Sequence, residues 1–131
     1  MIFVDTSIWF SAHIVEDLHY EQSEALPAKP ADRLVTTDYV IDELLTLLLV
    51  RGHRPVARML GPLLFSESMA EIIWVNQEDV EAAWHLFDAY TDKKWSFTDC
   101  VSYAVMKRLG IREAFALDDD FRQFGFVSVK P

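Results

Sequence analysis

Short apolar runs alternate with longer amphipathic stretches along this chain. Runs of this length that are rich in β-branched and aromatic residues are typical of buried strands. Because strands that alternate with helices form parallel sheets covered on both faces, the pattern predicts a single three-layer α/β domain with a short, mostly parallel central sheet flanked by helices. The expected strands are Ile2 to Val4, Leu34-Val35 (ended by Thr36-Thr37), Ile72 to Val75, Ala114 to Leu117 and Phe126 to Val129.

Capping residues and prolines set the expected limits of the helices. Thr6 or Ser7 is expected to cap the first helix, and the last large helix is expected to open at Ser96 with a capping box and to close at Gly110. The remaining expected helices run through His19 to Gln22, ending before Pro27; from Asp38 to Gly52; over Pro55 to Phe65; from Asn76 through VEAAWHLFDAY; and as one turn over Asp119 to Phe124.

Composition supports one domain over residues 1–131. The mass is 15.1 kDa and 51% of the residues are hydrophobic, which supplies a full core for a chain of this size. No apolar run approaches the length of a membrane span, and MIFVDTS lacks the basic start of a signal peptide. The single Cys100 fits a reducing compartment. We therefore expect a cytoplasmic protein.

The charge balance is strongly acidic, with 21 acids against 12 bases, a net charge of −9 and a pI near 4.7. This balance favours solubility and argues against binding of nucleic acid through a broad basic face. A nucleic-acid enzyme stays compatible with it if metal ions offset the charge at the point of contact, and so does a basic protein partner.

Four acidic residues stand at positions suited to chemistry. Asp5 and Asp118 follow the first and fourth expected strands, whose carboxyl ends meet at one edge of a parallel sheet. Glu43 lies in an apolar helical stripe, where its carboxylate needs a cationic side chain or a metal as partner, and Asp99 is the third residue after Ser96 in the capping box. Local capping or a salt bridge explains each acid taken singly.

Taken together, these acids predict a site for Mg²⁺ or Mn²⁺. Carboxylates that meet at one sheet edge repel each other unless a cation lies between them, and oxygen-only ligands select hard cations. The chain offers no zinc-type Cys/His spacing, no Gly-rich phosphate loop and no Gly-x-Ser-x-Gly nucleophile motif.

Four segments resemble, in order, the four acidic motifs of the PIN-domain nucleases, and of the VapC-type toxins of toxin–antitoxin pairs in particular. They are VDTSIWF, TTDYVIDELLTLL, SFTDCVSYAVMKRLGI and AFALDDDFRQFGF. The resemblance covers essentially the whole chain and implies a PIN-like fold. It implies that Asp5, Glu43, Asp99 and Asp118 are the catalytic, metal-binding acids, with Thr6, Thr98 and Asp120 in support. Ala116 departs from the threonine that many relatives carry two residues before the fourth acid, and the run Asp118 to Asp120 leaves open whether Asp118 or Asp120 is the fourth ligand.

The resemblance implies metal-dependent hydrolysis of RNA phosphodiester bonds by the toxin of a type II pair, with an antitoxin protein as partner. Four bases, Lys93, Lys94, Lys107 and Arg122, are candidates to contact the RNA backbone. A PIN-like RNA-processing or non-catalytic interaction module is the alternative. A receiver-like Mg²⁺-binding domain fits less well, because the third strand ends in Asn76 where a phosphoacceptor aspartate would stand.

An excess of apolar residues in two neighbouring predicted helices indicates an interface. The helix around IDELLTLLLV is apolar on more than one face, which exceeds what a single core requires. Apolar residues continue in the next helix at Met59, Leu60, Leu63, Leu64 and Phe65. We expect this region to form a homodimer interface, an antitoxin-binding surface or both, whereas burial inside the monomer is the competing explanation.

Overall fold

A computed structural model describes residues 1–24 and 33–129. Five parallel strands form one sheet in the order β3-β2-β1-β4-β5. The strands are β1 (Ile2–Val4), β2 (Leu34–Thr37), β3 (Glu71–Ile73), β4 (Glu113–Phe115) and β5 (Val127–Val129). The predicted fold class is thus confirmed, and every strand pair in the described part of the chain is parallel.

The strand order creates a switch point at the centre of the sheet. The chain builds outward from β1 through β2 to β3, then crosses to the other side of β1 to form β4 and β5. In open α/β sheets, ligands bind outside the carboxyl ends of the strands at such a point. The loops that follow β1 and β4 are therefore the place where this fold can build a site.

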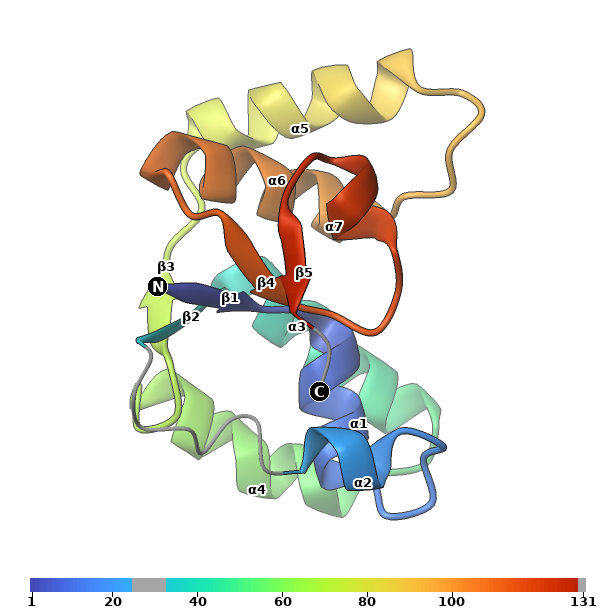
Figure 1. Ribbon diagram of the computed structural model, residues 1–131. Coiled ribbons are helices and arrows are strands. Elements are labelled where there is room, and N and C mark those ends of the chain that lie inside the picture. Colours follow the sequence, from blue (N-terminus) through green and yellow to red (C-terminus); the bar gives the residue numbers. More distant parts are fainter. Residues whose placement is uncertain (25–32, 130–131) are drawn as a thin grey trace.

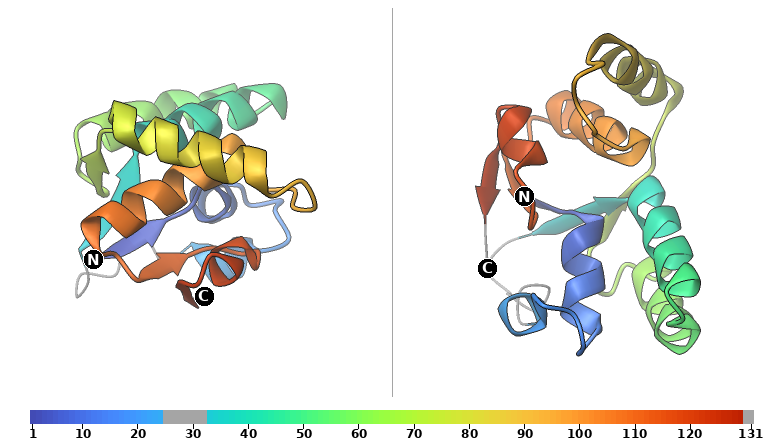
Figure 2. Two further views of the ribbon diagram at one scale, coloured as in Figure 1. Left: turned by 90° about the horizontal axis from the view of Figure 1, so that it is seen from above. Right: turned by 90° about the vertical axis from the view of Figure 1, so that its right-hand side faces the viewer.

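Helices cover both faces of the sheet (Figures 1 and 2). Helices α5 and α6 lie on one face, α1 and α2 lie on the other, and α3 contacts both α1 and α6. Helix α4 packs against α3. The helices are α1 (Thr6–His13), α2 (Tyr20–Ser23), α3 (Asp38–Val50), α4 (Arg54–Phe65), α5 (Gln77–Ala89), α6 (Phe97–Leu109) and α7 (Asp120–Gln123).

The main core lies where β1 and β2 meet α1 and α3. Phe3, Trp9 and Leu44 are fully buried there. The indole of Trp9 donates to the Thr36 hydroxyl at 3.4 Å, and that hydroxyl donates to the carbonyl of Val4 at 3.3 Å. This chain of hydrogen bonds satisfies the polar groups that burial would otherwise leave unpaired.

A second, smaller core joins α5 and α6. Asp79 on α5 is nearly fully buried and accepts two hydrogen bonds from the guanidinium of Arg108 on α6, at 2.8 and 2.9 Å. Asp79 also closes the capping box of Asn76 at the start of α5. One carboxylate therefore fixes both the beginning of α5 and its packing against α6.

Several predicted boundaries are corrected by the structure. The cap of α1 is Asp5, not Thr6 or Ser7, because the Asp5 carboxylate accepts from the amide of Ser7. Strand β2 continues through Thr36 and Thr37, which were expected to end it, since both side chains find hydrogen-bond partners inside the fold. Strands β3 and β4 each begin one residue earlier and end two residues earlier than predicted, and β5 begins one residue later.

The helix ends follow the sequence signals closely. Gly52 and Gly110 follow α3 and α6 with positive φ, of 81° and 69°, where glycine is favoured. Ser96 opens α6 with the predicted capping box. Pro27, expected just beyond α2, lies outside the described residues. None of the described helices is both long and apolar enough to cross a membrane.

Candidate active site

Asp5 is the most deeply buried of the candidate acids. It follows β1 directly and is only 4% exposed. Its carboxylate accepts from the Ser7 amide at 3.3 Å and from the Ser7 hydroxyl at 2.7 Å. The pKa of Asp5 is raised from 3.8 to about 6, mainly by burial; the charges of Asp118 and Glu43 act in the same direction, and the hydrogen bonds from Ser7 oppose the shift.

Asp99 reaches the same place from α6. It is the third residue after Ser96, and the two residues exchange the reciprocal bonds of a capping box at 3.0 and 3.1 Å. Burial and the charge of Asp5 raise the pKa of Asp99 to about 8, and Asp120 adds both its charge and a hydrogen bond between the two side chains. Asp99 therefore combines a local capping role with close electrostatic contact to Asp5.

The loop after β4 supplies two acids instead of one. Asp118 is exposed and accepts from the amide of Asp120 at 3.1 Å, while its pKa is raised by partial burial and by the charges of Asp119 and Asp120. The charge of Asp118 raises the pKa of Asp5, whereas the charge of Asp120 raises the pKa of Asp99. The sequence left open which of the two is the fourth site acid, and the structure brings both into the site.

Glu43 approaches from α3. It is half-buried and lines an open cavity of about 340 Å³ together with Asp42, Thr46 and Leu47 of its own helix. Thr98, next to Asp99 on α6, lines the same cavity. The salt bridge that would give Glu43 an ordinary structural role is absent from the described residues, where no Lys or Arg pairs with it.

Hydroxyl groups complete the surroundings of the acids. The Oγ1 of Thr6 is buried beside Asp5 and has no hydrogen-bond partner among the described residues. Ser102, one helical turn beyond Asp99, has a buried Oγ that is orphaned in the same way. A buried polar atom without a partner is costly, so a ligand or a water that accepts or donates here would stabilise the site.

The donor set fits a hard divalent cation. The side chains are oxygen donors from four elements of the fold, two carboxyl groups have pKa values raised to about 6 and about 8, and none of Asp5, Glu43, Asp99, Asp118 and Asp120 forms an ion pair with Lys or Arg among the described residues. Burial is the main cause of these raised pKa values and repulsion between the acids adds to it; a bound cation would offset both effects by stabilising the charged carboxylates.

The acids are not yet arranged as a complete metal-binding cluster. Within residues 1–24 and 33–129, no three side chains of His, Cys, Asp or Glu lie close enough together to hold one ion. The expected convergence of four carboxylates is thus only partial, and binding of a cation requires side-chain rotation toward a common centre.

Sequence reasoning missed the part played by Ser7. Its hydroxyl donates to Asp5 and accepts at 3.3 Å from the amide of Leu117, in the loop that carries Asp118. Ser7 thereby ties the loop after β4 to the first acid. Its position two residues after Asp5 signals only a cap, because the second contact spans 110 residues of sequence. Ala116, where many relatives carry threonine, is fully buried and adds no polar group.

The class of protein follows from sequence comparison and agrees with this fold and site. The profile of the PIN domain matches residues 2–127, and the chain belongs to the PIN domain family. The predicted membership is thereby confirmed.

The curated relatives are ribonucleases of the VapC type. The chain is 34% identical over 132 residues to the 23S rRNA-specific endonuclease VapC20 of Mycobacterium tuberculosis. The alignment covers 100% of this chain and 99% of that protein. It is 30% identical over 115 residues to the VapC ribonuclease of Archaeoglobus fulgidus, covering 83% of this chain and 72% of that protein. The predicted relationship to toxin ribonucleases is confirmed.

Solved structures agree. The crystal structure of Mycobacterium tuberculosis VapC20, described as a sarcin–ricin loop cleaving toxin, is similar with a TM-score of 0.91 and 30% identity over the whole of both chains. A toxin–antitoxin complex from Klebsiella pneumoniae has a TM-score of 0.60 and 18% identity, and covers 91% of this chain and 88% of that one. At that identity the second likeness shows the fold alone.

Proposed function

We propose that this protein is a metal-dependent endoribonuclease whose cofactor is Mg²⁺ or Mn²⁺, held by Asp5, Glu43, Asp99 and Asp118, with Asp120 beside Asp99. One observation carries the proposal. The Asp5 carboxyl is 4% exposed, feels the charges of Asp118 and Glu43, raises the pKa of Asp99 by its own charge, and has no cationic partner among the described residues. Burying like charges together is costly unless a cation joins them.

The chemistry expected of the site is hydrolysis of a phosphodiester. A divalent cation bound here supplies a water of lowered pKa and offsets negative charge on the phosphate. The Ser7 hydroxyl donates to Oδ2 of Asp5 and fixes that carboxylate, while the backbone amide of Ser96 donates to Oδ2 of Asp99. These bonds hold the two carboxylates at the start of α1 and of α6. Thr6 and Thr98 stand beside these two acids and are proposed to orient ligands or water.

Cleavage assays with matched variants test the site assignment. We expect Asp5→Asn and Asp99→Asn to abolish cleavage of an RNA pool in Mn²⁺ or Mg²⁺ while the fold stays intact, because asparagine keeps the capping bond but carries no charge. Asp88→Asn, an exposed acid on α5, is the control and should cleave normally. Wild-type cleavage in the presence of a chelator, or by Asp99→Asn, would refute the metal assignment. No cleavage by any variant would favour a non-catalytic module.

The substrate to assay first is ribosomal RNA. The mycobacterial relatives are described as 23S rRNA-specific and as cleaving the sarcin–ricin loop, and we propose that a structured rRNA loop is also the substrate of this chain. Intact ribosomes, naked 23S rRNA and an unrelated mRNA should be compared. Equal cleavage of all three would argue for an unspecific ribonuclease.

We also propose that an antitoxin and a second copy of this chain are partners. The apolar surface predicted on α3 and α4 is present only in part, because Leu60 and Leu64 are fully buried in the core. Five large apolar side chains stay exposed there: Leu49, Val50, Met59, Leu63 and Phe65.

Light scattering and the single variant Leu63→Glu test this surface. A dimer that the variant dissociates is expected. A wild-type protein that stays monomeric at micromolar concentration, and does not shift on addition of a cognate antitoxin, would contradict the proposal.

A further inference from the structure

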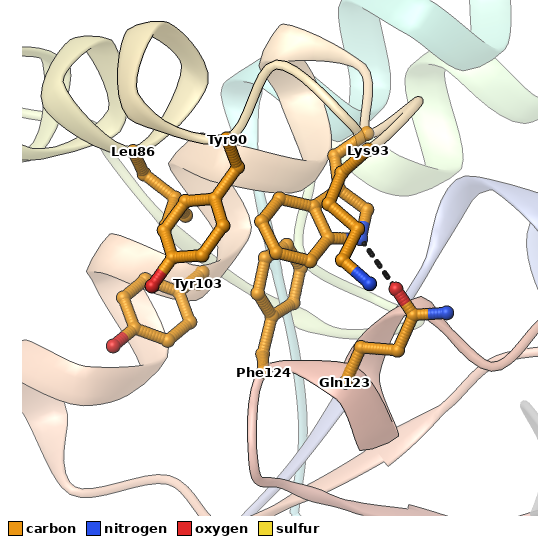
Figure 3. A pocket seen from close by; sticks show the side chains of 7 residues that line it. Leu86, Tyr90, Lys93, Tyr103, Gln123 and Phe124 are labelled. Atoms are coloured by element: carbon orange, nitrogen blue, oxygen red, sulfur yellow. Dashed lines mark hydrogen bonds between the residues drawn. The ribbon is translucent and has the colours of Figure 1, made fainter.

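An aromatic pocket lies apart from the carboxylates, where α5, α6 and α7 meet (Figure 3). It has a volume of about 290 Å³. Three structural segments supply its wall: the end of α5 and the connection that follows, the body of α6, and the end of α7. The lining residues are Leu86, Tyr90, Lys93, Trp95, Tyr103, Gln123 and Phe124.

The pocket is built largely from aromatic rings. Trp95 contacts Tyr90 with 5.2 Å and Phe124 with 4.3 Å between ring centroids, and Tyr103 lies 4.9 Å from Phe124. The indole N–H of Trp95 donates to the side-chain oxygen of Gln123 at 3.1 Å, which fixes the ring in place. Trp95 is 8% exposed while Tyr90 is 48% exposed, so Trp95 forms a rigid floor and Tyr90 an accessible wall.

Positive charge collects around these rings in an otherwise acidic protein. Lys93 extends toward Gln123 (Figure 3), and its ammonium lies 5.9 Å from the Trp95 ring centroid. The Lys107 ammonium lies 5.7 Å from the centroid of Tyr103. Arg122 is adjacent to Gln123 in the chain. Of the four bases that the sequence suggested for contact with RNA, Lys93 lines the pocket and Lys107 contacts one of its rings, whereas Arg122 pairs with Asp119.

The pocket is joined to the catalytic acids through two helices. Trp95 directly precedes Ser96, whose capping box holds Asp99. Gln123 follows Asp120 by one turn of α7, and Asp120 contacts Asp99. Trp95 is thus four residues from Asp99 in the chain, and Gln123 is three residues from Asp120.

We infer that this pocket binds an unpaired base of the RNA substrate, stacked against Tyr90 and Trp95, with Lys93 on the adjoining phosphate. The inference rests on the proposed function and adds to it a recognition site. Single-stranded RNA is recognised by stacking of splayed bases on aromatic rings together with basic side chains on the backbone. A base that is paired and stacked within a duplex cannot present its face to these rings, so the pocket is expected to favour looped or single-stranded RNA.

Two variants of exposed pocket residues test the inference in cleavage kinetics. Tyr90→Ala and Lys93→Gln should each raise KM for a single-stranded RNA about five- to tenfold, the low end of the loss found for one stacked base, while kcat changes little. Trp84→Ala and Arg112→Gln remove an exposed ring and an exposed base outside the pocket and should leave KM unchanged. An abasic nucleotide at the pocket position should weaken binding to wild type, but add nothing to Tyr90→Ala.

A second readout does not depend on cleavage. Addition of a mononucleotide to the full chain should shift the NMR signal of the Trp95 indole N–H, assigned with the variant Trp95→Phe. If RNA is cleaved normally by all variants and no mononucleotide shifts that signal, the pocket inference is wrong and the nuclease stands. If wild type cleaves no RNA, yet nucleotides shift the signal, the proposed function fails and base binding stands. Loss of antitoxin affinity alone in Tyr90→Ala would assign the pocket to protein recognition and overturn the inference.

Discussion

Replacement of Asp99 by Asn should stabilise the metal-free protein. Asp99 is held among other acids, with its pKa raised from 3.8 to about 8 by burial and by the charges of Asp5 and Asp120. The asparagine side chain has nearly the same shape, and its oxygen still accepts from the amide of Ser96, so the capping box survives. The substitution therefore removes an unfavourable charge without removing the local structure that the residue supports.

The size of the effect follows from the pKa shift. One pKa unit corresponds to about 1.4 kcal/mol between folded and unfolded states, so four units set an upper limit of roughly 5–6 kcal/mol at high pH. Asp99 is only partly buried, and water screens part of this cost. We therefore expect a gain of about 2–3 kcal/mol in the free energy of unfolding. With an unfolding entropy of about 2.1 cal/mol/K per residue, this raises Tm by roughly 7–11 °C.

The gain should depend on pH in a defined direction. A carboxyl whose pKa is raised by folding keeps its proton in the folded protein after the unfolded chain has lost it, so the stability that this group contributes is complete below about pH 4 and is lost as the pH rises toward 8. Wild-type Tm should fall over that pH range. Asp5 contributes a further loss of stability, which is complete near its own pKa of about 6. The Tm of Asp99→Asn should fall less.

Thermal melts in EDTA at pH 5 and pH 8.5, for wild type, Asp99→Asn and Asp88→Asn, measure this difference. Asp88→Asn removes one exposed negative charge and controls for the net charge alone. Mn²⁺ at a hundredfold excess over Kd should add about 2.7 kcal/mol to the stability of the wild type and much less to that of Asp99→Asn. A lower Tm of Asp99→Asn in EDTA at pH 8.5, or equal Mn²⁺ shifts in all three proteins, would refute the reasoning.

Three further predictions concern other positions. Asp118→Asn and Asp120→Asn should each weaken Mn²⁺ binding, because the first acid lies near Asp5 and the second near Asp99. Calorimetric titration should show a lower Mn²⁺ affinity for both variants; a lower affinity for only one would identify the single fourth ligand. Asp79→Ala should cost about 2–4 kcal/mol in urea unfolding, because Arg108 loses a buried partner and α5 loses its capping box; a cost below 1 kcal/mol would contradict this account. Gly110→Ala should cost about 1 kcal/mol, since φ there is 69° and an added Cβ meets no atom within 4 Å; a loss above about 3 kcal/mol would show that a steric clash, and not the backbone conformation, dominates.

The order of the elements could be predicted from sequence because each element carries its own local signal. Ser96 with Asp99 marks the start of α6, and glycines mark the ends of α3 and α6. The strand ends were predicted less well, because Thr36 and Thr37 are polar by composition and yet satisfy their hydroxyls through partners inside the fold. Local composition does not show such partners.

Contacts between residues far apart in the chain could not be predicted from the sequence. Arg108 and Asp79 are 29 residues apart, and the bond from Leu117 to Ser7 spans 110. The aromatic pocket likewise needs α5, α6 and α7 to be placed in space before Trp95 and Phe124 are seen to meet. In the sequence these rings are indistinguishable from ordinary core aromatics, and only their shared cavity indicates a ligand.

The distribution of charge explains how an acidic protein can act on RNA. The chain has a net charge of −9. At the proposed site a divalent cation would offset the acids, and Lys93 and Lys107 lie over the rings of Trp95 and Tyr103 in the separate aromatic pocket. Affinity for RNA should therefore come from a few local contacts and depend on bound metal, instead of on a broad basic face. It follows that the salt dependence of RNA binding should be shallow, with a slope set by the one or two phosphates that these lysines neutralise.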